Sequence, residues 1–202
     1  MTGKIAASGN INSLLEEDEE TARTISLAGK DHCYYNMFNG CSSLTTAPEL
    51  PATTLANGCY SSMFYGCASL NQAPVLPATT LAKICYNWMF NGCTSLTTAP
   101  ALPATTLAGY CYSRMFNGCT SLTTAPELPA TTLTSYCYSW MFSDCTSLSS
   151  LKVAFTAWGS ETRNWLDNVA ATGTFECPQT LIDNTTTRDS NTVPSSWTMV
   201  AV

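Results

Sequence analysis

The chain has 202 residues, of which only 11% are charged, and eight Lys and Arg against fourteen Asp and Glu give a net charge of −6. Because the basic residues are scattered and form no patch, nucleic acid is not an expected partner. The sequence has no apolar run of about 18 residues, so no membrane insertion is predicted, and its length suits one elongated domain.

Residues 1–32 lack the repeat that follows and are predicted to form an N-terminal cap. Apolar residues there are expected to lie over the open end of a stack, which would otherwise expose its core. These residues are Ile5, Ile11, Leu14 and Leu15. Residues 16–20 are five consecutive acids, and a solvated face is favoured over a calcium site because neighbouring carboxylates point in different directions.

A repeated stretch dominates residues 33–148, and its clearest copy, CYSRMFNGCTSLTTAPELPATTL, occupies residues 111–133. The copies start 26 residues apart, at Cys33, Cys59, Cys85, Cys111 and Cys137. A fixed period of this length predicts a solenoid of five stacked copies.

The first part of each copy has helical spacing. Projected on a helix, five apolar residues of 33–41 fall within one arc, and the later copies keep them. They are Cys33, Tyr34, Met37, Phe38 and Cys41. The pattern predicts a short helix that lies on a core and ends at Gly40. Two turns are marginal alone, so neighbouring copies are expected to stabilise them.

The second part of each copy, SLTTAPxLPATTL, favours an extended chain. Very short parallel strands are predicted around Thr45–Ala47 and its copies, because Pro48 cannot donate to a strand ladder. Pro51 is expected to turn the chain toward the next copy.

The eleven cysteines are predicted to be buried free thiols that act as small apolar groups. Cys33 and Cys41 lie too far apart along a helix for a disulfide, and equivalent cysteines of neighbouring copies lie slightly beyond the usual bridge spacing. A zinc site needs ligand pairs such as CxxC, which the sequence does not contain.

Residues 149–202 are predicted to form a C-terminal α/β cap in which Phe175 and Trp197 cover the last copy. A helix is expected over 157–169, with a polar loop between the last two strands. The expected strands cover 148–155, 174–177 and 196–202.

The copies of MFxGCxSLTTAPxLPATTLAxxCY resemble the 26-residue repeat of bacterial surface proteins, the BspA-like branch of the leucine-rich repeats. The segments 165–175 and 193–198 are similar to closing segments of that group. The resemblance implies an α/β leucine-rich-repeat solenoid of short helices and very short parallel strands with capped ends. It also implies a secreted or surface protein linked to adhesion to host proteins, bacteria or glycans, with no catalytic residues to carry over.

Two surfaces compete as binding faces. The strand side presents mainly threonines, with Glu49, Val75, Ala101 and Glu127 varying beside them. The helix side presents aromatic residues, and exposed aromatics are the more informative feature. The candidate ligand-binding residues are Trp88, Arg114, Trp140, Tyr110, Tyr136 and Tyr65.

Trp88, Arg114 and Trp140 share one position in consecutive copies. We expect Arg114 to lie between the two indoles as a cation–π stack. Such a stack either is purely structural or forms a platform for sugar rings.

The sequence therefore favours a non-enzymatic, adhesin-like module that binds a surface protein or glycan and is expected to be a monomer. The alternative is a structural spacer that displays another domain of a larger surface protein. With His32 as the only histidine, no catalytic, metal or cofactor site is predicted. The expected location is extracellular or the cell surface, with the export signal outside this chain, because residues 1–30 lack an apolar signal core.

Overall fold

The fold is described from a computed structural model, in which residues 5–15, 20 and 26–202 are described. The described part is of mixed α/β type, with few, short helices and parallel strands. The elements are β1 (Ile5–Ala6), η1 (Ile11–Leu14), β2 (Leu44–Thr46), β3 (Ser150–Lys152), η2 (Ser160–Thr162), β4 (Thr174–Cys177), α2 (Gln179–Asp183) and β5 (Thr198–Ala201).

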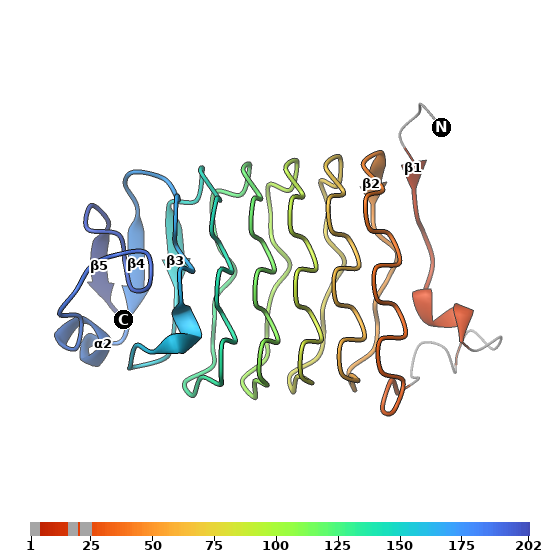
Figure 1. The fold of residues 1–202 in the computed structure, drawn as a ribbon, viewed down its shortest axis with the longest axis horizontal. Helices are drawn as coiled ribbons and strands as arrows, with labels where there is room; N and C mark the ends of the chain where they lie inside the picture. The colour runs from red at the N-terminus through yellow and green to blue at the C-terminus, as the bar shows by residue number, and fades with distance from the viewer. Residues whose placement is uncertain (1–4, 16–19, 21–25) are drawn as a thin grey trace.

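Successive copies of the repeat lie side by side along the molecule, with the N-terminal segment at one end and β3, β4 and β5 at the other (Figure 1). Backbone hydrogen bonds join each copy to the next. The Tyr34 amide donates to the Cys59 carbonyl at 2.9 Å, and the Tyr60 amide donates to the Cys85 carbonyl at 3.0 Å. Each copy is therefore held mainly by its two neighbours.

The first part of each copy is a series of tight turns, so the predicted short helix is wrong. We call residues 32–41 and their counterparts (58–67, 84–93, 110–119 and 136–145) the turn segments. Their amides alternate between two kinds of partner. The Tyr35 amide bonds the carbonyl three residues earlier, at His32, whereas the Asn36 amide crosses to Ser61 of the next copy. An α-helix would keep all of these bonds within the segment.

Every fourth residue of a turn segment has a left-handed backbone. The φ angles are 56° at His32, 57° at Asn36 and 74° at Gly40, and the later copies repeat the pattern. The buried residues predicted for a helix are nevertheless largely correct. Spacing of i, i+1, i+4, i+5 and i+8 fits a four-residue period as well as a 3.6-residue one over so short a segment.

Aromatic side chains form two continuous columns in the core. Neighbouring tyrosine rings (34, 60, 86, 112 and 138) stack with centroids 5.5–6.1 Å apart, and neighbouring phenylalanine rings (38, 64, 90, 116 and 142) with centroids 5.5–5.7 Å apart. Offset stacking contributes about 0.5–1.5 kcal/mol per pair beyond area burial. The columns therefore extend the same packing through all five copies.

The cysteines are free thiols, nine of them buried and two, Cys33 and Cys41, half-buried. The predicted burial is thus confirmed for the second to fifth copies and for Cys177, and the first copy is the exception. The thiol of Cys93 donates to the Phe64 carbonyl at 3.2 Å, and that of Cys119 to the Phe90 carbonyl at 3.1 Å. Burial raises the pKa of the Cys59 thiol to about 12.

The extended part of the copies contains fewer strands than predicted. β2 is the only strand that the described repeats contain, and it pairs in parallel with β1. Later copies make single parallel bridges, such as Thr80 with Thr106. Pro48 and its counterparts remove an amide donor in every copy, which limits the ladder to such short contacts.

The N-terminal segment lies against the first copy, where the Ile11 amide donates to the Glu49 carbonyl at 3.1 Å. Ile11 is buried, but Leu14 and Leu15 are exposed, which contradicts their predicted packing. The side chain of Ile5 and residues 16–19 of the acidic run lie outside the described residues.

The C-terminal region continues the stacking. β3, β4 and β5 form a parallel sheet in which Ser150, Thr174 and Thr198 are in register, 24 residues apart. The strand predicted at 174–177 is confirmed as β4, and Phe175 and Trp197 are buried as expected.

The helix predicted over 157–169 is wrong. Only the 3-10 turn η2 forms there, because residues 164 and 168 have φ of 51° and 54° and continue the turn-segment pattern. Asparagine tolerates the left-handed conformation. The α-helix α2 instead occupies part of the predicted polar loop.

Candidate functional site

The candidate site lies on the turn segments of the third to fifth copies. Five of the six predicted ligand-binding residues line one groove there, with a volume of about 550 Å³. Its described lining is Lys83, Ile84, Asn87, Trp88, Tyr110, Ser113, Arg114, Tyr136, Ser139, Trp140 and Arg163. We call this the aromatic groove.

The predicted stack of Trp88, Arg114 and Trp140 is confirmed. The guanidinium carbon of Arg114 lies 4.5 Å from the centroid of the Trp88 ring and 5.3 Å from that of Trp140. The backbone sets this geometry, because the Trp88 amide donates to the Ser113 carbonyl and the Arg114 amide to the Ser139 carbonyl. Side chains at one position of consecutive copies therefore face one another.

A second aromatic pair lies four residues before this stack. The rings of Tyr110 and Tyr136 are stacked with centroids 5.1 Å apart and an interplanar angle of 17°. Tyr65 lies outside the aromatic groove, although its ring is 5.8 Å from that of Trp88 and both residues line a neighbouring depression of about 290 Å³. The structure thus places Tyr65 at the margin of the candidate site.

The main side chains of the aromatic groove sit at the left-handed positions. At the matching positions the first copy has His32 and Asn36 and the second has Gly58 and Ser62, and of these residue types asparagine and glycine tolerate positive φ. The third to fifth copies carry bulky residues there instead, at φ of 55–62°. They are Ile84, Trp88, Tyr110, Arg114, Tyr136 and Trp140. Each such residue costs about 1–3 kcal/mol of backbone strain, and strain of this kind clusters at functional sites.

The aromatic groove is also locally basic. Lys83, Arg114 and Arg163 line it, and its described lining contains no acidic residue. Lys83 and Arg163 are exposed, whereas Arg114 is half-buried by the two indoles. Sequence reasoning missed Lys83, Ile84 and Arg163. The 26-residue spacing of Ile84, Tyr110 and Tyr136 would have identified Ile84, but Arg163 follows the change to a 24-residue spacing.

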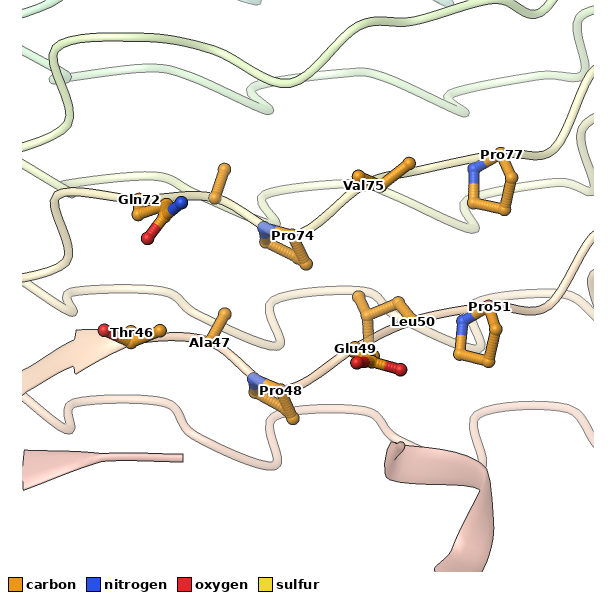
Figure 2. Close-up of a pocket in the computed structure, with 11 residues that line it drawn as sticks. Thr46, Ala47, Pro48, Glu49, Leu50, Pro51, Gln72, Pro74, Val75 and Pro77 are labelled. Carbon is orange, nitrogen blue, oxygen red and sulfur yellow. The ribbon is translucent and has the colours of Figure 1, made fainter. Parts of the chain in front are cut away.

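The opposite candidate surface, on the proline side, also has a groove. Figure 2 shows it between the first two copies, with Pro48 beside Pro74 and Pro51 beside Pro77. Its volume is about 590 Å³, and Val75 on its margin is 77% exposed. A similar hollow recurs around Pro103 and Pro129. Because repeated prolines line both hollows, this groove follows from the repeat sequence and is not specific to one copy.

No group of three or more His, Cys, Asp or Glu side chains within the described residues is arranged to hold a metal ion. The helices of the described chain are all too short to cross a membrane. Comparisons with known protein families, curated proteins and solved structures find no match to this chain.

Proposed function

We propose that the five copies and their flanking segments form a leucine-rich-repeat solenoid of the BspA-like kind, with caps at 1–32 and 149–202. The constant 26-residue period, the parallel bridges between copies and the unbroken aromatic columns support this class. In this solenoid, series of turns replace the short helices that the resemblance implies.

We further propose that the chain is a non-enzymatic, adhesin-like module that binds a glycan or protein outside the cell or at its surface. The aromatic groove is the proposed binding face. One observation carries this proposal: bulky aromatic and basic side chains occupy left-handed positions in three consecutive copies, where Asn or Gly would cost less. Their strain is unexplained by packing alone, because they lie at the surface rather than in the core.

A second candidate function is a spacer that displays another domain of a larger surface protein. The observation that favours it is the continuity of the tyrosine and phenylalanine columns, which makes five copies one stiff unit. In that case, the stack of Trp88, Arg114 and Trp140 is structural, and the aromatic groove binds nothing.

The test compares the unmodified chain with a Trp88→Asn, Trp140→Asn double variant on a glycan array and in pull-downs from bacterial and host surface extracts. Asparagine suits the backbone at these positions, as Asn36 shows, so the variant is expected to fold. The proposed function predicts that binding falls by about tenfold or more, the loss expected for removing aromatic contacts worth about 1.4 kcal/mol or more.

Val75→Ala on the proline side is the matched control and should leave binding unchanged. Binding by the double variant that equals that of the unmodified chain would exclude the aromatic groove. Absence of binding by the unmodified chain in both assays would favour the spacer.

A further inference from the structure

Resting on the proposed function, we propose that the aromatic groove selects anionic saccharides, sugars that carry carboxylate or sulfate groups. The chain as a whole has a net charge of −6, which disfavours the approach of an anionic ligand. A site for such a ligand therefore needs a local concentration of positive charge.

The aromatic groove provides that concentration. Three of the eight Lys and Arg residues of the chain line this one site, and no acidic residue of the described chain lines it. The side chains of Lys83, Arg114 and Arg163 make no ion pair with any described residue. By contrast, Lys152 on the strand side is paired with Glu127 at 3.0 Å. The three groove cations are therefore available to a ligand.

Arg114 is the best placed of the three. The indoles of Trp88 and Trp140 lie within 4.5 and 5.3 Å of its guanidinium carbon and hold it in place. Contacts with ring faces leave the N–H edge of a guanidinium available, and that edge matches a carboxylate or sulfate with two parallel hydrogen bonds. No hydrogen bond joins this guanidinium to another described residue.

The rest of the aromatic groove favours a sugar over an acidic peptide. Extended peptides commonly bind by adding a strand to a free backbone edge. Here the backbone amides of Trp88 and Arg114 already bond the next copy, so this face has no free edge. The groups that remain available to a ligand are aromatic rings and side-chain hydroxyls, including those of Tyr110, Tyr136 and Ser113. Rings offer apolar faces to a sugar, and hydroxyls offer hydrogen-bond partners.

The test measures binding of the whole chain by isothermal titration calorimetry to matched saccharides. One pair is oligogalacturonate and its fully methyl-esterified form, which has the same rings without the charge. The other is a dextran oligosaccharide and its sulfated form. The inference predicts that at least one charged form binds about tenfold or more tightly than its neutral partner, as expected for a charged hydrogen bond, and that added salt weakens the binding. The pair that responds identifies carboxylate or sulfate as the recognised group.

A Lys83→Gln, Arg163→Gln double variant should reduce this preference for the charged form, because it removes two of the three groove cations and keeps Arg114. Both side chains are exposed, so their removal leaves the core intact. Lys152→Gln, which removes a cation from the other side of the chain, should retain it. An equal loss in Lys152→Gln would indicate unspecific charge attraction and overturn the inference.

Equal binding of charged and neutral forms would also overturn the inference while leaving the proposed function intact. Binding of none of the four saccharides would overturn it as well. The proposed function would still stand in that case if the array or pull-down detects a partner that the Trp88→Asn, Trp140→Asn variant loses.

Discussion

The tyrosines at equivalent positions of the five copies have hydroxyl groups in different surroundings. The Tyr34 hydroxyl lies 3.1 Å from Asn12 Oδ1 in the N-terminal segment. The hydroxyls of Tyr60 and Tyr86 are buried and have no hydrogen-bond partner among the described residues. A buried polar group without a partner destabilises a fold by about 1–3 kcal/mol.

We therefore expect Tyr86→Phe to raise the free energy of unfolding by about 1 kcal/mol, because it removes an unpaired hydroxyl and keeps the ring. Tyr34→Phe is the matched control, and it should lower the free energy of unfolding by about 1 kcal/mol because it breaks a bond to Asn12. Urea denaturation of both variants measures the two changes. If Tyr86→Phe lowers the free energy of unfolding more than Tyr34→Phe does, the Tyr86 hydroxyl is not an unpaired group.

Backbone strain gives a second residue-level prediction. Ile84 is β-branched and has φ of 62°, a conformation that costs an L residue about 1–2 kcal/mol. Ile84→Asn should raise the free energy of unfolding by about 1 kcal/mol, and the opposite exchange at another left-handed position, Asn36→Ile, should lower it by a similar amount. Thermal and urea denaturation test both signs. Equal destabilisation by the two substitutions would show that side-chain packing, not backbone conformation, decides stability at these positions.

At the scale of elements, the sequence predicts which side chains face inward better than it predicts the element that carries them. The spacing of Cys59, Tyr60, Met63 and Phe64 requires only that residues return to one side about every four positions. The alternating hydrogen bonds that distinguish turns from a helix involve backbone atoms of the next copy. Single-copy periodicity contains no information about these bonds.

The candidate site was predictable to the extent that it depends on the repeat. Trp88, Arg114 and Trp140 occupy the same position in consecutive copies, so their contact follows from the period. The left-handed backbone at these residues could not be predicted, because side chains of this size rarely adopt it. Arg163 was missed because the spacing between copies shortens after residue 148.

The C-terminal sheet supplies a prediction at this scale. A Cβ added at Gly173 would lie 2.6 Å from both the Ser149 carbonyl oxygen and the indole of Trp197, which is 1% exposed. We expect Gly173→Ala to lower the free energy of unfolding by about 1–3 kcal/mol, because neither neighbour moves easily.

Gly109→Ala is the control for this substitution. Its added Cβ would meet only the Ser135 carbonyl oxygen at 3.7 Å, and its φ is not positive. Its effect on stability should be within about 0.5 kcal/mol. Urea denaturation followed by tryptophan fluorescence measures both variants, and a Gly173→Ala variant as stable as Gly109→Ala would contradict the close packing of Trp197.

At the scale of the whole molecule, stability depends on interactions repeated from copy to copy. The second to fifth copies each contribute two cysteines, a tyrosine, a methionine and a phenylalanine to a continuous core, and the first copy contributes all of these but Met37, which is exposed. Burial raises the pKa of the thiols, for example to about 12 at Cys59, Cys111 and Cys145, from 9.0. The raised pKa values of these thiols all make stability depend on pH in the same direction, so their contributions add.

The chain should accordingly lose stability in alkali. Below pH 9 the thiols are protonated in both the folded and the unfolded chain, and their burial contributes fully to the free energy of unfolding. Above pH 9 the unfolded chain releases protons that the folded chain retains. The free energy of unfolding therefore falls by about 1.4 kcal/mol per pH unit for each such thiol, up to the folded pKa near 12.

Urea denaturation at pH 8, 9 and 10 measures this slope. The Cys111→Ala variant should show a slope smaller by about 1.4 kcal/mol per pH unit at pH 10, even though it is less stable at pH 8. A pH-independent free energy of unfolding between pH 8 and 10 would contradict the burial of protonated thiols.

The residues at the left-handed positions of the third to fifth turn segments lie at the surface, whereas the apolar residues between them lie in the core. Residues 84, 88, 110, 114, 136 and 140 line the aromatic groove, while residues close to them in sequence fill the core. A combinatorial library restricted to these six codons would change what the surface recognises and leave the hydrogen-bonded framework as it is. The natural chain already tolerates at these positions an aliphatic, an aromatic and a cationic side chain, so the framework is suited to engineering new binding specificities.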